Sequence, residues 1–200
     1  MDMSTRCFFN FLCGSIIASS ALVSGCALHP VGVIDGQAVA PGSTEAVVVH
    51  GMQQPEFRYV FVKGKIENGM FEQTKSVGAL MGAPDKGYLV GKIEAGDVIA
   101  LIQIGRIERQ GNEQVSFRTG CGHPVRVFAV PGGKVSYLGD ARVAITRNRE
   151  LQVDYSANFQ DAKNYVDSHF PALKDHLEPL ASQVVPYKCP PSYQYYMIYK

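Results

Sequence analysis

Cys121 and His123 are the two residues best suited to chemistry, because side chains two positions apart share one face of a strand. A thiol beside an imidazole forms a nucleophile and its base, or half of a metal site. No spacing places a partner Asp, Asn or second ligand pair beside them. The surrounding GCGHPV starts like a Gly-x-Gly phosphate loop, but Val125 stands where the third glycine belongs. A Cys/His-based hydrolase is therefore the weakest of three functional interpretations.

Other catalytic motifs are missing from the sequence. It contains no G-x-S-x-G elbow, no H-E-x-x-H, no G-x-x-x-x-G-K-[ST] loop and no C-x-x-C pair. We therefore predict no catalytic residues, no cofactor and no metal site. The net charge is +1, and residues 1–25 contain one acid and one base, so their removal leaves it unchanged. Nucleic-acid surfaces normally carry a basic excess, so we expect no nucleic-acid partner.

A third kind of chemistry concerns Cys26. Residues 1–6 are polar with one cation, Arg6, and residues 7–23 are mostly apolar or small, which is the layout of a secretory signal peptide. The alternative, an uncleaved membrane helix, needs about 20 predominantly apolar residues, and this stretch is too short and interrupted. The following LVSGC resembles the lipobox of bacterial lipoproteins. The resemblance implies cleavage before Cys26 and diacylglycerol and palmitate on its thiol.

The resemblance also implies a location. Ala27 follows the cysteine, whereas Asp at that position resembles the inner-membrane retention signal of enteric bacteria. We therefore expect a protein of the bacterial envelope, in the outer membrane facing the periplasm. Its partners would be the membrane, through the N-terminal lipid, and other envelope proteins.

Export makes the remaining cysteines informative. Cys7 and Cys13 leave with the signal peptide and Cys26 is acylated, so Cys121 and Cys189 are the thiols that remain. Two cysteines in an oxidising compartment predict one disulfide. The alternative is two independent thiols, because pairing depends on geometry that sequence does not show.

The mature chain divides into a flexible lipidated tether over residues 26–45 and one domain over residues 46–200. The tether contains Pro30 and Pro41 and has no sustained periodicity. The domain alternates short apolar segments with turn residues, which predicts a mainly β fold, an antiparallel β-sandwich or a barrel-like relative of one. The expected strands are 46–50, 57–64, 87–93, 97–107, 114–119, 125–130, 134–139, 141–147 and 151–156.

The C-terminal quarter changes period. Residues 158–169 place apolar side chains at helical spacing, with Asn158 as the cap and Pro171 ending the helix. A last strand over 192–200 would put Tyr193, Tyr195 and Tyr199 on one face. We favour tyrosines that cover the core, and the alternative is a binding face.

One stretch resembles uncharacterised bacterial lipoproteins with small β-sandwich domains. The similar residues are 128–140, which end in YLGD, together with KIEAGD at 92–97 and HFP at 169–171. The similarity spans about residues 57–175. It implies a β fold with a helix and no catalytic residues. From the residues themselves, we expect Gly139 and Asp140 to open the turn after this strand.

Three functions follow from these observations. We favour a non-enzymatic interaction or accessory module of the envelope. The alternative is a binding module for cell wall or a small ligand, for which the terminal tyrosines could stack on sugar rings. The third is the hydrolase centred on Cys121 and His123.

Overall fold

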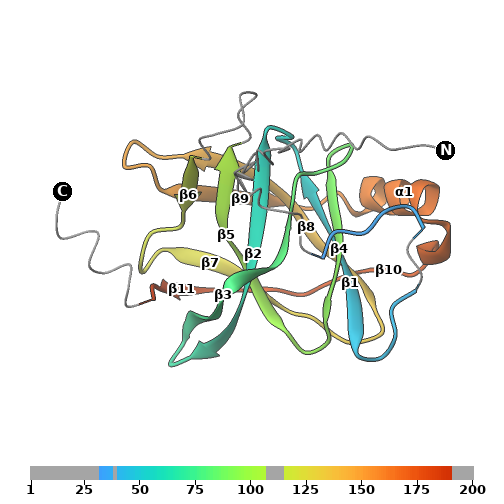
Figure 1. Cartoon of the computed structure of the whole chain (residues 1–200), viewed down its shortest axis with the longest axis horizontal. Coiled ribbons are helices and arrows are strands. Elements are labelled where there is room, and N and C mark those ends of the chain that lie inside the picture. Colours follow the sequence, from blue (N-terminus) through green and yellow to red (C-terminus); the bar gives the residue numbers. More distant parts are fainter. Residues whose placement is uncertain (1–31, 38–39, 107–114, 191–200) are drawn as a thin grey trace, which may run out of the picture.

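The computed structural model describes residues 32–37, 40–106 and 115–190, and the fold within them is mainly β with one helix near the C-terminus, as the sequence predicts (Figure 1). The strands are β1 (Glu45–Met52), β2 (Phe57–Glu67), β3 (Met70–Gly82), β4 (Tyr88–Glu94), β5 (Val98–Arg106), β6 (Ser116–Arg118), β7 (Pro124–Ala129), β8 (Val135–Ile145), β9 (Leu151–Ser156), β10 (Leu177–Pro179) and β11 (Gln183–Lys188). The helix α1 is Phe159–His169, followed by the 3₁₀ turn η1, Pro171–Leu173.

Five strands close into a barrel. The order is β2-β3-β11-β7-β5, and β2 also pairs with β5, so the ring has no free edge; β6 adds to β5 outside the ring. Each of the five contributes to one cluster of buried side chains, which therefore fills the barrel interior. Its members are Val62, Phe71, Ala100, Ile102, Val125, Val127, Tyr187 and Cys189.

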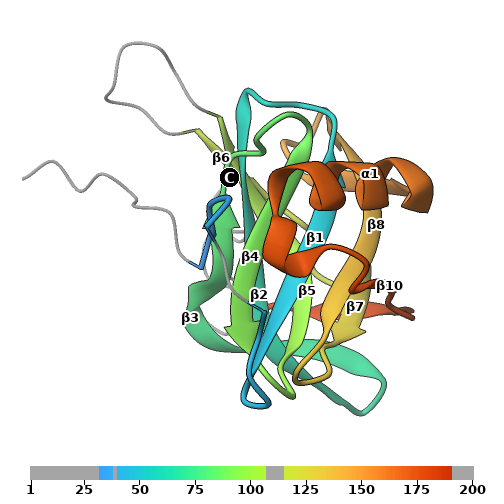
Figure 2. The same ribbon diagram turned by 90° about the vertical axis from the view of Figure 1, so that its right-hand side faces the viewer.

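A second sheet packs beside the barrel. Its order is β4-β1-β8, and β10 and β9 pair with successive halves of the far edge of β8. One face of this sheet packs on the outer wall of the barrel. The helix α1 covers the other face, which Figure 2 shows with α1 in front of β1, β4 and β8.

Strand β1 is the centre of this layered arrangement. Val48 packs toward the barrel while Val47 and Val49 pack toward α1, and all three are fully buried. Burying a valine side chain contributes roughly 1.5–3 kcal/mol. A strand covered on both faces is a continuous apolar run, which is why AVVV here does not alternate.

The expected antiparallel β-sandwich is not confirmed. One of the two sheets is a closed barrel, and three strand pairs are parallel, β1 with β8, β10 with β8, and β11 with β3. An alternating pattern tells which face of a strand is buried. It does not tell which strand lies beside it, so the pairing could not be predicted from periodicity.

The predicted turn at Gly139 is wrong, because β8 runs through it as one strand where two were expected. Gly139 instead forms a bulge: its φ is +93°, and the register against β1 shifts between Val49 and Gly51. A side chain at Gly139 would strain this backbone, and its Cβ would lie 3.0 Å from the Ser156 carbonyl oxygen.

The bulge turns Asp140 toward the start of α1. The buried Asp140 carboxylate accepts hydrogen bonds from the Tyr137 hydroxyl at 2.6 Å and from the Asn158 backbone N–H at 2.9 Å. Asn158 is the N-cap residue of α1, as the sequence predicts, but its side chain makes no capping hydrogen bond. Gly51 leaves space for the carboxylate, because a Cβ there would lie 1.9 Å from Asp140 Oδ1.

The same bulge holds a buried histidine on the barrel side. His50 is 0 % exposed, and its Nδ1 donates to the Gly139 carbonyl oxygen at 2.5 Å. Its ring contacts Phe61, Phe128 and Tyr155. Because a carbonyl only accepts, Nδ1 carries a proton. Burial lowers the pKa of His50 to about 4 despite that hydrogen bond, which opposes the shift.

Part of the predicted tether lies against the second sheet. Val33 forms a bridge with Gly91, the Ile34 N–H donates to the Val90 carbonyl oxygen at 3.1 Å, and the Ile34 side chain packs on the cluster under α1. These residues therefore extend the sheet beyond β4.

His50 predicts a pH-dependent stability. Its folded pKa lies below the ordinary 6.5, so the unfolded chain binds the proton first as pH falls. Its contribution is complete above about pH 7 and is lost between about pH 6.5 and 4, to a total of about 3 kcal/mol. Urea unfolding of wild type and His50→Gln at several pH values measures this, because glutamine keeps an N–H donor but does not titrate there. The pH slope should flatten in His50→Gln and persist in the control His176→Gln, an exposed position; equal slopes in all three proteins would contradict the assignment.

Candidate functional site

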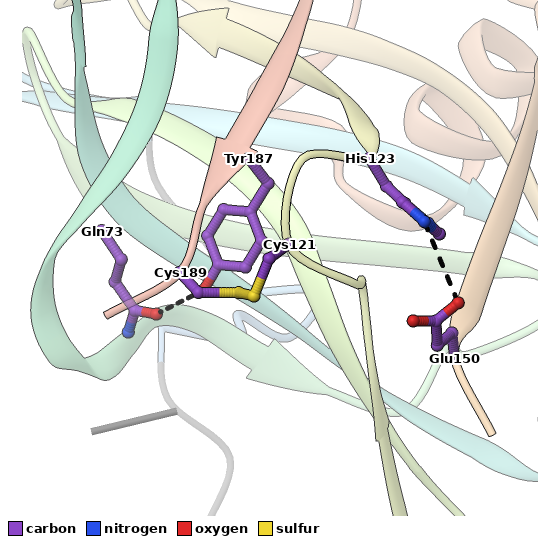
Figure 3. Close-up of a disulfide and its surroundings, with 6 residues drawn as sticks. All are labelled: Gln73, Cys121, His123, Glu150, Tyr187 and Cys189. Carbon is purple, nitrogen blue, oxygen red and sulfur yellow. Dashed lines mark hydrogen bonds and ion pairs between the residues drawn. A yellow bond between two sulfur atoms is a disulfide. The ribbon is translucent and has the colours of Figure 1, made fainter. Parts of the chain in front are cut away.

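Cys121 and Cys189 form the disulfide that the sequence predicts, with sulfur atoms 2.01 Å apart and Cα atoms 5.2 Å apart (Figure 3). The bond joins the β6–β7 loop to the chain just beyond β11. Two backbone hydrogen bonds support it, from the Gly122 N–H to the Tyr187 carbonyl oxygen at 2.8 Å and from the Tyr187 N–H to the His123 carbonyl oxygen at 2.9 Å. The loop is thereby fixed to the barrel.

Tyr187 anchors the other side of this junction. Its ring is buried inside the barrel and contacts Phe71, and its hydroxyl donates to Gln73 Oε1 on β3 at 3.4 Å (Figure 3). The disulfide therefore lies at the end of a filled barrel and not beside an empty chamber.

His123 extends from the same loop toward the β8–β9 turn. Its Nε2 lies 4.0 Å from Glu150 Oε2, and Figure 3 shows the two side chains facing one another. Glu150 also fits over Gly120, where a Cβ would lie 2.6 Å from its Oε1. Three hydrogen bonds of Thr146 close the turn that presents Glu150, two with Glu150 and one with Arg149. The loop over residues 119–124 consequently packs against this turn.

A cleft of about 270 Å³ opens between β7, β9 and this loop, and we call it the β7–β9 cleft. Apolar side chains from β5, β7 and β9 form part of its wall. Its polar and aromatic lining consists of Thr119, His123, Arg126, Gln152, Asp154 and Tyr155. On the other side of the loop a second hollow, of about 400 Å³, contains the disulfide, Arg118, Arg149 and Glu150.

Arg126 and Tyr155 are the central pair of the β7–β9 cleft. The Arg126 guanidinium carbon lies 4.3 Å from the Tyr155 ring centroid, a cation–π contact. Arg126 follows the alternation of β7, because Val125 and Val127 point into the barrel and Arg126 points out of it. Burial raises the pKa of the Tyr155 hydroxyl, and the nearby Arg126 opposes that shift. Tyr155 therefore stays neutral at physiological pH.

The geometry does not support a Cys/His catalytic pair. Cys121 lies in a turn and not on a strand, so the expectation of a shared strand face with His123 is wrong. The Cys121 sulfur is bonded to Cys189, so it is not available as a thiolate nucleophile. The part of the chain that the structure describes contains no group of His, Cys, Asp and Glu side chains arranged to hold a metal ion.

The other predicted residues lie outside the described ranges. Cys26 belongs to residues 1–31, and Tyr193, Tyr195 and Tyr199 belong to residues 191–200. Among the residues described, no helix is long and apolar enough to cross a membrane.

Sequence reasoning missed Arg126, Tyr155 and Glu150. A charged residue between two valines in VRVFAV is what an ordinary half-exposed strand shows. Nothing in that pattern indicates that the outward face of β7 meets β9. Glu150 could have been suspected only if the contact between its turn and the β6–β7 loop were known.

Comparison of the chain with known protein families, with characterised proteins and with solved structures finds no match. The function must therefore be inferred from the chain itself.

The disulfide should contribute a large part of the stability. It closes a segment with a sequence separation of 68, for which chain entropy gives about 4 kcal/mol. The double variant Cys121→Ala/Cys189→Ala should therefore unfold at markedly lower urea concentration than wild type, measured by circular dichroism without reductant. Wild type treated with a strong reductant is the matched control and should lose a similar amount. An unchanged midpoint in both would show that the bond does not constrain the domain.

Proposed function

We propose that this protein is an exported, lipid-anchored interaction module of the bacterial envelope, and that it acts by binding and not by catalysis. The Cys121–Cys189 disulfide is the observation that supports this most. Structural disulfides persist in oxidising compartments such as the periplasm and are rare in the cytosol. A disulfide in the domain agrees with a signal peptide and a lipidated Cys26 at the N-terminus.

The disulfide also bears on the choice between binding and catalysis. The hydrolase hypothesis needs a free Cys121 thiol, and the bond to Cys189 occupies that sulfur. His123, the proposed base, has a side chain that is 51 % exposed, with Glu150 as its neighbour. An imidazole on the rim of a cleft suits recognition as well as proton transfer, and the Cys121 thiol that it would activate is not free.

A binding module for cell wall or a small ligand is the second candidate. The β7–β9 cleft favours it, because the cleft combines apolar walls with a few converging polar groups. The outer-membrane location remains part of the proposal through Ala27. In that position the domain would face the periplasm, where both envelope proteins and cell wall are within reach.

Lipidation at Cys26 is directly testable. Cells that express the full chain should incorporate labelled palmitate into it, and Cys26→Ser should abolish the label. The variant should also leave the membrane fraction, because serine has no thiol to acylate and the chain then lacks the acyl groups that stable anchoring requires. Cys121→Ala/Cys189→Ala is the control and should keep the label. Normal labelling of Cys26→Ser would refute the anchor.

The two binding roles predict different partners. If the chain is an accessory module, crosslinking in intact cells should recover one defined envelope protein with it. If it binds cell wall, the detergent-purified protein should pellet with isolated sacculi. The proposal would be contradicted if both binding tests failed and the wild-type protein hydrolysed an ester or amide substrate.

A further inference from the structure

Arg126 carries a positive charge that the structure leaves without a counter-charge. The residue is half-buried, and its Nε is shielded from solvent without a hydrogen-bond partner. Among the residues that the structure describes, no carboxylate forms an ion pair with it. Its guanidinium carbon lies 4.3 Å from the centroid of the Tyr155 ring. A partly buried cation without a hydrogen-bonded anion is unfavourable and unusual.

The surroundings of Arg126 do not neutralise it. Its charge acts on the buried His50 and lowers the pKa of that ring further. Glu150 faces His123 across the loop, in the second hollow. Asp154 lines the β7–β9 cleft but lies outside ion-pair distance of the guanidinium. The Arg126 end of the cleft is therefore electropositive.

We propose that the β7–β9 cleft binds a carboxylate group, with the Arg126 guanidinium as its principal contact. A guanidinium presents parallel N–H donors that match the two oxygens of a carboxylate. The cation–π contact with Tyr155 holds the guanidinium in place, so less conformational freedom is lost on binding. The inference refines the binding role proposed above by naming the chemical class of the ligand.

The other lining groups fit a small, singly charged ligand. The Thr119 hydroxyl and the Gln152 amide are hydrogen-bond donors for it, and the apolar wall from Val153 and Tyr155 accepts a short carbon skeleton. The volume of about 270 Å³ lies just below the range of about 300–1,000 Å³ for drug-sized ligands. Asp154 disfavours a doubly charged phosphate more than a carboxylate, because its repulsion grows with ligand charge.

Isothermal titration calorimetry with the full-length protein in detergent tests this proposal. The probes are acetate, the dipeptide alanyl-alanine, its C-terminal amide and inorganic phosphate. Acetate binding as tightly as the dipeptide would identify a small free acid as the ligand, and tighter dipeptide binding would identify a peptide C-terminus. The amide, which lacks the carboxylate, should not bind.

Variants separate the site from general charge effects. Arg126→Gln should weaken carboxylate binding by about tenfold or more, the usual loss when a charge-assisted hydrogen bond is removed. Arg142→Gln removes the same charge from an exposed position on β8 and should leave the affinity within about twofold. Arg126→Lys keeps the charge but not the two parallel donors, so its affinity should fall between wild type and Arg126→Gln.

A measurement on wild type guards against a variant that fails to fold. Phenylglyoxal modifies exposed arginine side chains, and acetate should protect Arg126 but not Arg142, as read from peptide masses. Equal binding by Arg126→Gln and wild type would overturn the proposal. Tighter binding of phosphate than of either carboxylate would overturn it too, as would no binding of either carboxylate together with no protection of Arg126. Because calorimetry does not depend on the lipid, failure here is distinguishable from failure of the proposed anchor.

Discussion

The Cys121–Cys189 disulfide is the constraint on which the rest of the structure depends. The barrel closes through β11, whose pairing with β3 consists of only two residue pairs, Tyr187 with Phe71 and Lys188 with Glu72. The covalent bond lies immediately beyond this short seam and ties the end of β11 to the β6–β7 loop. That loop in turn forms one wall of the β7–β9 cleft. The disulfide therefore reinforces the short β3–β11 seam, fixes a loop that lines the cleft and makes the Cys121 thiol unavailable.

The second sheet is joined to its neighbours by the bulge in β8. On the barrel side, the Gly139 carbonyl accepts from the buried His50, and on the helix side, Asp140 accepts from Tyr137 and from the backbone at Asn158. These polar groups lie inside two apolar clusters, where an unsatisfied partner costs about 1–3 kcal/mol. The bulge thus fixes the register of β1 against β8 and the point at which α1 begins. Because the Tyr155 ring contacts both His50 and Arg126, the buried centre is in contact with the cleft.

The sequence predicted what depends on local periodicity and on counting. Alternation identified most strands, and helical spacing identified α1. The number of cysteines that remain beside the predicted signal peptide and lipid anchor predicted the disulfide. The sequence did not predict β3, where MFEQTKSVGALMG mixes polar and small residues without sustained alternation. The register of β3 against β2 shifts twice, and its pairing with β11 covers two residue pairs. The sequence left the sandwich and the barrel-like alternative both open, and it did not predict the parallel pairing or Arg126, because these depend on which strands meet. The resemblance to lipoproteins stays a prediction for Cys26, which lies outside the described residues.

The proposed export and binding role both depend on the redox state of the Cys121–Cys189 pair in the cell. The direct measurement is to quench cells with acid, alkylate free thiols with a maleimide of known mass, and analyse the peptides that contain Cys121 and Cys189. We predict linked, unalkylated peptides in the full chain and alkylated cysteines in a form lacking residues 1–25 that stays in the cytoplasm. Alkylated Cys121 and Cys189 in the full-length, membrane-fraction protein would contradict it.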